Sequence, residues 1–219
     1  MKPTQNTQLN KIDPITNPNT LTILDRYLLA SHWCKNKLVA DYACGYGHGT
    51  GILHSLGARY VVGFDFEKST IDENKRRYDV NEKKDNSVYF EHKDVTKPSL
   101  ERYDDFFDTI ISIETFEHIP RDNVNQYLNN IKKMLKKGGR AIITTPIRKT
   151  DKFVYQKGST HLYEYNLNEF LEEISKVFPK FKLDSLVEFR SVPNGLLHTE
   201  LINGVQPVSR LFWCEVINE

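Results

Sequence analysis

The chain has 219 residues, with 30 Lys and Arg against 29 Asp and Glu, so its formal net charge at pH 7 is +1. This balance gives no strong field toward nucleic acid or an acidic membrane, and no apolar run approaches the ~20 residues that span a bilayer. The length suits one domain with a full core, so we expect residues 1–219 to form a single domain. The three cysteines lack a Cys-x-x-Cys pair, which predicts reduced thiols, and residues 1–19 lack the apolar core of a signal peptide. We therefore expect a cytoplasmic protein with a flexible N-terminal arm over residues 1–19.

Helical and strand-like patterns alternate along the chain, which predicts an α/β sheet fold. Helical spacing of apolar residues predicts helices over residues 20–33, 49–56, 69–78, 122–137 and 166–177. Short apolar runs predict strands over residues 38–42, 60–64, 88–91, 107–113, 140–145, 182–190 and 211–217. The last two of these strands have no helix between them, which favours antiparallel pairing. The stretches 147–165 and 191–210 are predicted to be long loops, and loops of that length are often functional.

The most informative segment covers residues 39–50, where an apolar run ends in Asp41 and glycines follow at alternate positions. Gly45, Gly47 and Gly49 predict a tight turn between a strand and a helix, because glycine reaches backbone conformations closed to other residues and lets a ligand lie against it. Such turns serve dinucleotides and S-adenosylmethionine (SAM) alike. Asp41 favours SAM, because a carboxylate facing the ligand would repel a pyrophosphate and attract an amino-acid ammonium.

Acidic residues follow three successive predicted strands, and they are Asp41, Asp65 and Asp94. In an open parallel sheet, ligands bind beyond the carboxyl ends of the strands. Asp65 is spaced to accept hydrogen bonds from both ribose hydroxyls, and Asp94 to accept one from the adenine amine. Together with the glycine turn, the three acids indicate a site for an adenosyl amino acid.

With these motifs the chain resembles the class I SAM-dependent methyltransferases. The segments that are similar to the family's motifs are residues 41–49, 62–65, 92–95, 107–119 and 135–140. The resemblance implies a Rossmann-like three-layer sandwich with SAM as cofactor. Its seven-stranded sheet would have the order 3-2-1-4-5-7-6, with strand 7 antiparallel. Ala43 departs from the family, which often has glycine at this position.

The resemblance assigns cofactor binding to the residues of these motifs. They are Asp41, Ala43, Cys44, Gly45, Tyr46, Gly47, Gly49, Asp65, Phe66, Asp94, Val95, Ile113 and Glu114. The reaction that it implies is displacement of the SAM methyl group by a nucleophile held in line with it. When the nucleophile is a hydroxyl, the protein must also take its proton.

His118 is the histidine expected at a strand end over the cofactor. An imidazole with an unperturbed pKa of about 6.5 can act as a base near neutral pH. A histidine in the matching loop is the base in sugar O-methyltransferases of this superfamily, so the resemblance makes His118 a catalytic base. The alternative is that His118 only orders the loop. Its neighbour Glu117 is expected to bind substrate.

The segment from His161 to Tyr165 resembles a His-x-x-Glu segment found in a subset of these enzymes. His161 is a second catalytic candidate, because His161 and Glu164 could bind acceptor hydroxyls or form a base-orienting pair. Alternatively, Glu164 caps the following helix and His161 packs structurally. The aromatic residues Tyr155 and Tyr163 are expected to line the acceptor, although aromatic faces suit sugars and quinones equally. Nothing visible in the sequence requires a metal, so we expect no metal site.

We therefore expect a SAM-dependent methyltransferase, monomeric or homodimeric, that acts on a hydroxyl of a small molecule. A sugar or glycan is the preferred acceptor, and a quinone, phenol or amine is the alternative. Nucleic acid is disfavoured, because the loop 113–116 lacks the prolines with which amino-methylating enzymes hold an extruded base. A non-catalytic SAM-binding subunit and a nicotinamide-dependent dehydrogenase are the remaining interpretations. The stretches 147–165 and 191–210 are expected to flank the acceptor.

Overall fold

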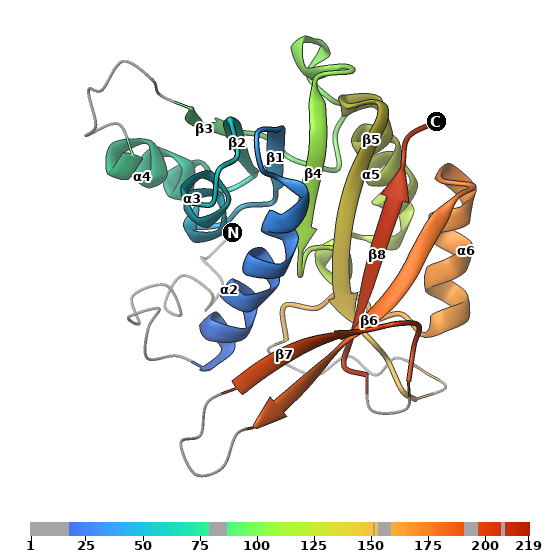
Figure 1. The fold of residues 1–219 in the computed structure, drawn as a ribbon. Helices are drawn as coiled ribbons and strands as arrows, with labels where there is room; N and C mark the ends of the chain where they lie inside the picture. Colours follow the sequence, from blue (N-terminus) through green and yellow to red (C-terminus); the bar gives the residue numbers. More distant parts are fainter. Residues whose placement is uncertain (1–17, 79–86, 151, 153–158, 191–196, 207–208) are drawn as a thin grey trace.

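A computed structural model describes residues 18–78, 87–150, 152, 159–190, 197–206 and 209–219 (Figure 1). Within these residues, one sheet of eight strands has the order β3-β2-β1-β4-β5-β8-β6-β7. The strands are β1 Leu38–Tyr42, β2 Tyr60–Asp65, β3 Val88–His92, β4 Phe107–Ile113, β5 Leu135–Pro146, β6 Phe181–Arg190, β7 Leu197–Ile202 and β8 Leu211–Ile217. The α-helices are α2 Pro18–Ala30, α3 His48–Ser55, α4 Lys68–Tyr78, α5 Arg121–Met134 and α6 Leu167–Val177. Three short 3-10 helices are η1 Ser31–Trp33, η2 Glu101–Tyr103 and η3 Phe116–His118.

Helices cover both faces of the sheet, which gives three layers (Figure 1). α2, α3 and α4 lie over one face, and α5 and α6 lie over the other. The central strands β1 and β4 are consequently buried on both sides, as near-continuous apolar strands in parallel sheets are. The predicted three-layer α/β fold is confirmed.

The sheet follows the predicted order and adds one strand to it. β3-β2-β1-β4-β5-β8-β6 reproduces the expected 3-2-1-4-5-7-6, and β8 runs antiparallel to both β5 and β6. The expected count of seven strands is wrong, because β7 pairs antiparallel with β6 at the sheet edge. β7 lies inside the stretch 191–210, which was expected to be a loop. Within the described part of that stretch, backbone pairing with β6 replaces an irregular connection.

The connection from α5 to β5 also differs from the prediction. Gly138 and Gly139 were expected to end the helix, but α5 ends at Met134 and β5 starts at once, with Leu135 paired to Phe107. The pairing of β4 with β5 then shifts register, and Gly138 has a φ of +75° within this irregularity. The glycine pair therefore forms a strand irregularity, where a left-handed residue is needed.

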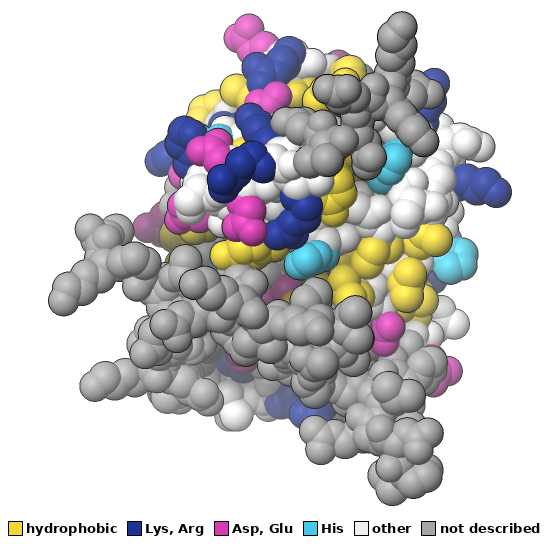
Figure 2. All heavy atoms as spheres, turned by 90° about the vertical axis from the view of Figure 1, so that its left-hand side faces the viewer, with side chains coloured by type: hydrophobic (Ala, Val, Ile, Leu, Met, Phe, Trp, Pro, Cys, Tyr) yellow, Lys and Arg dark blue, Asp and Glu magenta, His cyan; other side chains and the backbone are white. Residues whose placement is uncertain are grey.

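α4 carries a solvated face of mixed charge. Its ion pairs are Lys68–Asp72 and Glu73–Arg77, each one helical turn apart. Figure 2 shows the side of the molecule that carries α4, where basic and acidic side chains lie next to one another. Exposed pairs of this kind add little stability, so burial of the opposite face, with Asn74 in it, fixes the helix.

Two global properties complete the description. None of the described helices combines the length and the apolar character needed to cross a membrane. Cys34, Cys44 and Cys214 are buried and free, as predicted for reduced thiols.

Candidate active site

The glycine turn joins β1 to α3 and takes its shape from left-handed residues. Ala43, Gly45 and Gly47 have φ values of +72°, +51° and +72°. The N–H groups of Ala43 and Cys44 both donate to the carbonyl of Phe64 on β2, at 2.9 and 2.8 Å. These two bonds hold Ala43 in a conformation that strains a residue with a Cβ by about 1–2 kcal/mol, which explains why glycine suits this position.

Gly45 and Gly49 have opposite surroundings. A Cβ added to Gly45 would meet no heavy atom of the described residues within 4 Å, so among these residues the turn borders open space at this point. A Cβ added to Gly49 would lie 2.0 Å from the ring of Tyr27 on α2. Gly45 therefore leaves room for a ligand against the backbone, whereas Gly49 lets α2 approach the turn.

Asp41 is fully buried beneath the turn. One carboxylate oxygen accepts a hydrogen bond from the hydroxyl of Tyr27 at 2.9 Å, and the other accepts one from Thr50 at 2.6 Å. Burial raises the pKa of Asp41 to about 6, although both hydrogen bonds oppose that shift. Asp41 was expected to face the ligand. In the structure its two hydrogen bonds join β1 to α2 and α3. Asp41 can therefore act on a ligand through its charge.

Because the pKa of Asp41 is about 6 in the folded protein and near 3.8 in the unfolded chain, the folded state holds this proton more tightly. Its contribution to stability is present below about pH 4 and is lost as the pH rises through about 6. We expect wild type to lose about 3 kcal/mol of unfolding free energy relative to Asp41→Asn between about pH 4 and pH 7. Urea unfolding of both proteins across that range measures the difference. Burial raises the pKa values of the neighbouring Tyr27 and Cys44, so both stay protonated in this range and do not add to the effect. If the difference in unfolding free energy between wild type and Asp41→Asn does not change with pH, the raised pKa of Asp41 is wrong.

Asp65, at the end of β2, secures the turn from the other side. Its oxygens accept hydrogen bonds from the N–H groups of Gly45 and Glu67, both at 2.9 Å. Burial raises the pKa of Asp65. An ionised carboxylate has about four lone-pair sites, so Asp65 can still accept two further donors, such as a pair of hydroxyls. The ring of the next residue, Phe66, is 69% exposed and offers an apolar face beside this carboxylate.

The residues after β3 are further along the same edge of the sheet. One oxygen of Asp94 accepts from the N–H and the hydroxyl of Thr96, which closes a local turn. The Val95 side chain is buried in the core, and its carbonyl accepts bonds from Tyr42 and Asn130. Asp94 is therefore partly exposed at this edge of the sheet, whereas Val95 fixes the segment to the core.

Side chains of α4 hold the carbonyls of the turn. Asn74 donates to Gly45 at 2.7 Å, and Tyr78 donates to Gly47 at 2.9 Å. Arg77 donates to the carbonyl of Tyr46 at 3.2 Å. The sequence did not single out these three residues, and helical spacing along α4 was the available signal for Asn74 and Tyr78.

Glu114, directly after β4, is a further left-handed residue, with a φ of +51°. Its carboxylate accepts from Thr144 and forms an ion pair at 3.4 Å with Arg26, a buried residue of α2. Ile113 before it is buried. α2 therefore contacts the site twice, through Tyr27 at Asp41 and through Arg26 at Glu114, and no sequence pattern predicted either contact.

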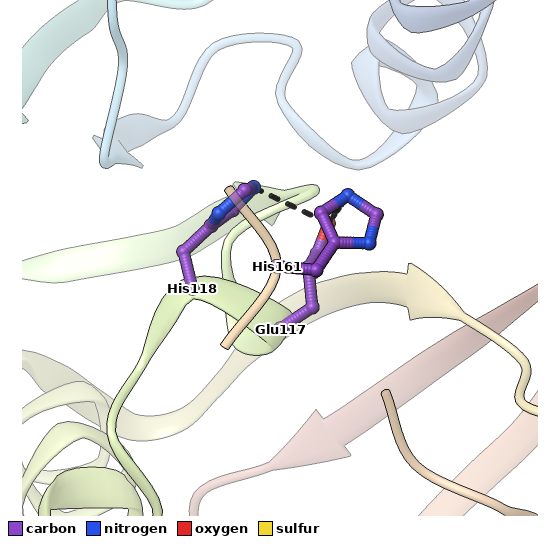
Figure 3. Close-up of side chains that lie close together, drawn as sticks. All are labelled: Glu117, His118 and His161. Atoms are coloured by element: carbon purple, nitrogen blue, oxygen red, sulfur yellow. Dashed lines mark ion pairs between the residues drawn. The ribbon is translucent and has the colours of Figure 1, made fainter. Parts of the chain in front are cut away.

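The two histidines singled out from the sequence lie together (Figure 3). The His118 and His161 rings meet edge to face, with centroids 5.1 Å apart. Nε2 of His118 lies 3.7 Å from Oε1 of Glu117, and Nε2 of His161 lies 4.0 Å from the same oxygen. Burial lowers the pKa of His118 and raises that of Glu117, whose side chain is only 1% exposed.

Each of the two rings is oriented by a hydrogen bond at Nδ1. Nδ1 of His118 lies 2.9 Å from the Thr160 carbonyl, and Nδ1 of His161 lies 2.7 Å from Oε1 of Glu164. Helix α6 is capped by Asn166, which forms a capping box with Glu169. Glu164 is thus the partner of His161 and does not cap the helix.

The structure gives less support to the prediction that Tyr155 and Tyr163 line the acceptor. The Tyr163 hydroxyl donates to Glu169 at 2.7 Å, and its ring packs against the guanidinium of Arg121. The structure thus directs the polar end of Tyr163 to the start of α6. Tyr155 lies outside the described residues.

The two halves of the site lie at one edge of the sheet. The glycine turn follows β1, and η3 with Glu117 and His118 follows β4, which is the parallel neighbour of β1. One half offers backbone, carboxylates and an exposed aromatic ring, and the other offers imidazole nitrogens able to take a proton or hold an ion. Such an edge can bind a nucleoside-like molecule beside a second reactant.

Comparisons with known proteins agree with this geometry. Residues 39–139 match the family model described as a methyltransferase domain. The chain is 32% identical over 117 residues to a ubiquinone biosynthesis O-methyltransferase, mitochondrial, of Dictyostelium discoideum. That alignment covers 51% of this chain and 36% of the relative, so the chain spans little more than a third of that protein.

Solved structures share the fold. A TehB-like SAM-dependent methyltransferase from Corynebacterium glutamicum superposes with a TM-score of 0.59 at 19% identity, over 89% of this chain and 86% of that one. A SAM-dependent methyltransferase from Aquifex aeolicus superposes with a TM-score of 0.61 at 16% identity, over 95% and 100% of the two chains. At these identities the likeness concerns the fold alone. The matched segment, residues 39–139, is thus similar to a methyltransferase domain on a fold shared with SAM-dependent methyltransferases, and this similarity implies SAM as the methyl donor.

Proposed function

We propose that the protein catalyses transfer of the SAM methyl group to a hydroxyl of a small acceptor. The observation that carries this proposal is a cluster of three side chains beside the glycine turn that follows β1. Glu117 and His118 lie on η3, after β4, and His161 comes from the segment before α6. Transfer to oxygen needs a place where the hydroxyl proton is removed. The cluster supplies nitrogen and oxygen lone pairs at this place.

The residues around the turn fit SAM. Gly45 borders open space, Asp65 keeps acceptor capacity for ribose hydroxyls, and exposed Phe66 offers a face for adenine. Bound SAM supplies an electrophilic methyl group at this edge of the sheet. Three buried residues support the turn: Asp41 by its charge, and Cys44 and Val95 by packing.

On the acceptor side, His118 is the proposed base. Its Nδ1 hydrogen is engaged by the Thr160 carbonyl, so Nε2 carries the lone pair and can accept a proton. His161 is held in the same way by Glu164 and can orient a second acceptor oxygen. Glu164, whose side chain is 33% exposed, would bind the acceptor's polar groups, whereas Glu117, which was expected to do so, is buried.

The acceptor class follows from these polar groups. Two imidazoles and two carboxylates within reach of one another suit a molecule with adjacent oxygens, which a sugar and a dihydroxyphenol both have. The similarity to a protein named for O-methylation in ubiquinone biosynthesis supports oxygen as the accepting atom, and it favours the phenolic or quinone class over the sugar that the sequence suggested.

Asp65→Asn is expected to weaken binding of S-adenosylhomocysteine by about tenfold to a hundredfold, because it removes a charged acceptor for two hydroxyls. Fluorescence or calorimetric titration measures this. Asp72→Asn on the solvated face of α4 serves as the matched control, since Asp72 is exposed and pairs only with Lys68 among the described ion pairs. Equal affinities in wild type and Asp65→Asn would remove Asp65 from the ribose site.

The test of the function has two stages. SAM should raise the melting temperature and NAD should not, because a ligand stabilises the protein to which it binds. Labelled SAM is then offered with catechols, simple phenols, monosaccharides and amines. Transfer to a hydroxyl compound supports the proposal. Stabilisation by SAM without transfer to any acceptor would favour a non-catalytic subunit, and stabilisation by NAD a dehydrogenase.

A further inference from the structure

Three electron-pair donors converge at the acceptor side of the site. Oε1 of Glu117, Nε2 of His118 and Nε2 of His161 all lie within 4.8 Å of one another. Figure 3 shows the three side chains turned toward one another, two from η3 and one from the segment before α6. The fold thus brings two distant segments of the chain together. The hydrogen bond between His118 and Thr160, which are 42 residues apart, shows this separation.

When the imidazoles are neutral and Glu117 is ionised, no hydrogen lies between these donors. Each ring places its Nδ1 against an oxygen that can only accept, the Thr160 carbonyl or the Glu164 carboxylate. The hydrogen of each ring is therefore on Nδ1, and both Nε2 atoms present lone pairs. Two such lone pairs facing a carboxylate oxygen repel one another unless a positive charge lies between them.

The carboxylate at the base of this cluster supports the same conclusion. Oε1 of Glu117 is buried and has no hydrogen-bond partner in the described part of the chain, while Oε2 accepts from the Thr145 hydroxyl at 2.9 Å. A buried polar atom without a partner is costly and calls for a physical explanation, an ion being one. The Glu117 side chain is 1% exposed, and its unpartnered oxygen is directed at the two imidazoles.

We propose that Glu117, His118 and His161 bind a divalent first-row transition-metal ion. Two imidazoles and one carboxylate are ligands that zinc, iron and cobalt accept, whereas magnesium and calcium prefer oxygen alone. Donors about 2.1 Å from a tetrahedral ion lie about 3.4 Å apart, so closing the cluster requires shifts of about 1 Å or less. The sequence had given no reason to expect this metal site.

The neighbours of the three ligands match what metal sites require. Metal-bound histidines almost always donate their other nitrogen to a carbonyl or carboxylate, and bound carboxylates are hydrogen-bonded in turn. Thr160, Glu164 and Thr145 provide one such partner to each ligand. Each ligand is thus oriented before an ion arrives.

Three protein ligands leave coordination positions open. The His118 and His161 side chains are 35% and 31% exposed, so these positions face the accessible side of the cluster. A tetrahedral ion keeps one open position beside these three ligands. When the ion expands to five or six ligands, adjacent positions open, which two neighbouring oxygens of a vicinal dihydroxy acceptor fill. With the ion bound, His118 would act as a ligand in place of its role as the base. The ion would lower the pKa of the coordinated hydroxyl, whose proton would leave to water. This role of the ion rests on the proposed function, whereas the metal site itself does not.

Calorimetry with Zn²⁺ on full-length protein freed of metal by a chelator tests the site. We expect one ion per chain with a Kd of about 1 µM or tighter. His161→Ala should weaken binding at least about a hundredfold, and Glu164→Ala about tenfold to a hundredfold, because Glu164 orients His161. His32→Ala is the matched control, since His32 is exposed and bonds locally to Leu29. Co²⁺ should give a visible absorption spectrum in wild type that His161→Ala abolishes.

Absence of stoichiometric Zn²⁺ binding would overturn the inference, as would equal affinities in wild type and His161→Ala. His161 is partly exposed on a loop, so this variant should fold, and a melting curve checks it. Binding of S-adenosylhomocysteine is measured on the same samples. Cofactor binding without zinc binding removes the metal site and leaves the proposed function, whereas zinc binding without cofactor binding supports the metal site and contradicts the proposed function.

Discussion

His118→Ala should bind SAM as wild type does and lose methyl transfer by about a hundredfold to ten-thousandfold in kcat. The imidazole lies at the acceptor side of the site, with its Nε2 3.7 Å from Glu117 and its Nδ1 held by the Thr160 carbonyl. Its removal takes away a nitrogen that accepts the hydroxyl proton or holds the proposed ion. The cofactor-side contacts of Asp65 and the glycine turn remain, so affinity for S-adenosylhomocysteine should change by less than about twofold.

Steady-state transfer of labelled methyl groups and cofactor titration on the same samples separate the two effects. His32→Ala again serves as the control, because His32 lies away from the cluster and is exposed. If His118→Ala retains near-normal turnover with the true acceptor, His118 only orders its loop, which is the alternative that the sequence left open.

Gly49→Ala should lower the free energy of unfolding by about 3 kcal/mol, although alanine is the better helix former. The new Cβ would lie 2.0 Å from the ring of Tyr27, which is only 5% exposed and has no free space to enter. α2 must then move away from α3, and the bond from Tyr27 to Asp41 is lost. For a chain of this size, the melting temperature should fall by roughly 6–12 °C.

A double-mutant cycle identifies the cause. In a Tyr27→Ala background the ring is absent, so Gly49→Ala should cost far less there than in wild type. Gly45→Ala gives the backbone cost alone, about 1 kcal/mol, because the φ of Gly45 is +51° and its added Cβ meets no atom within 4 Å. Equal costs of Gly49→Ala in both backgrounds would show that contact with Tyr27 is not the reason for this glycine.

The parts of the site that local sequence determines could be predicted. Glycines after an apolar run predicted the turn. The acids Asp41, Asp65 and Asp94 after successive strands predicted one site, because parallel strands end at one edge of the sheet. The spacing of His161 and Glu164 also gave a pair that the structure forms. Each of these signals lies within a few residues along the chain.

Features set by distant contacts could not be predicted. Tyr27 and Thr50 reach Asp41 from two helices, and no local pattern marks them as its partners. The same holds for the strand β7, which forms by pairing with β6 in a stretch whose prolines and glycines suggested a loop. Gly138 signalled a break in the chain correctly, but Leu135 already pairs with Phe107 before it, so the break falls within a strand.

The proposed function requires this sheet edge to bind an adenosyl amino acid. Isothermal titration calorimetry with S-adenosylhomocysteine tests it most directly, since no acceptor is needed. One molecule should bind per chain with a Kd below about 100 µM, and Asp65→Asn should bind it more weakly. No binding by folded wild-type protein at about 1 mM ligand would contradict the assignment of the site.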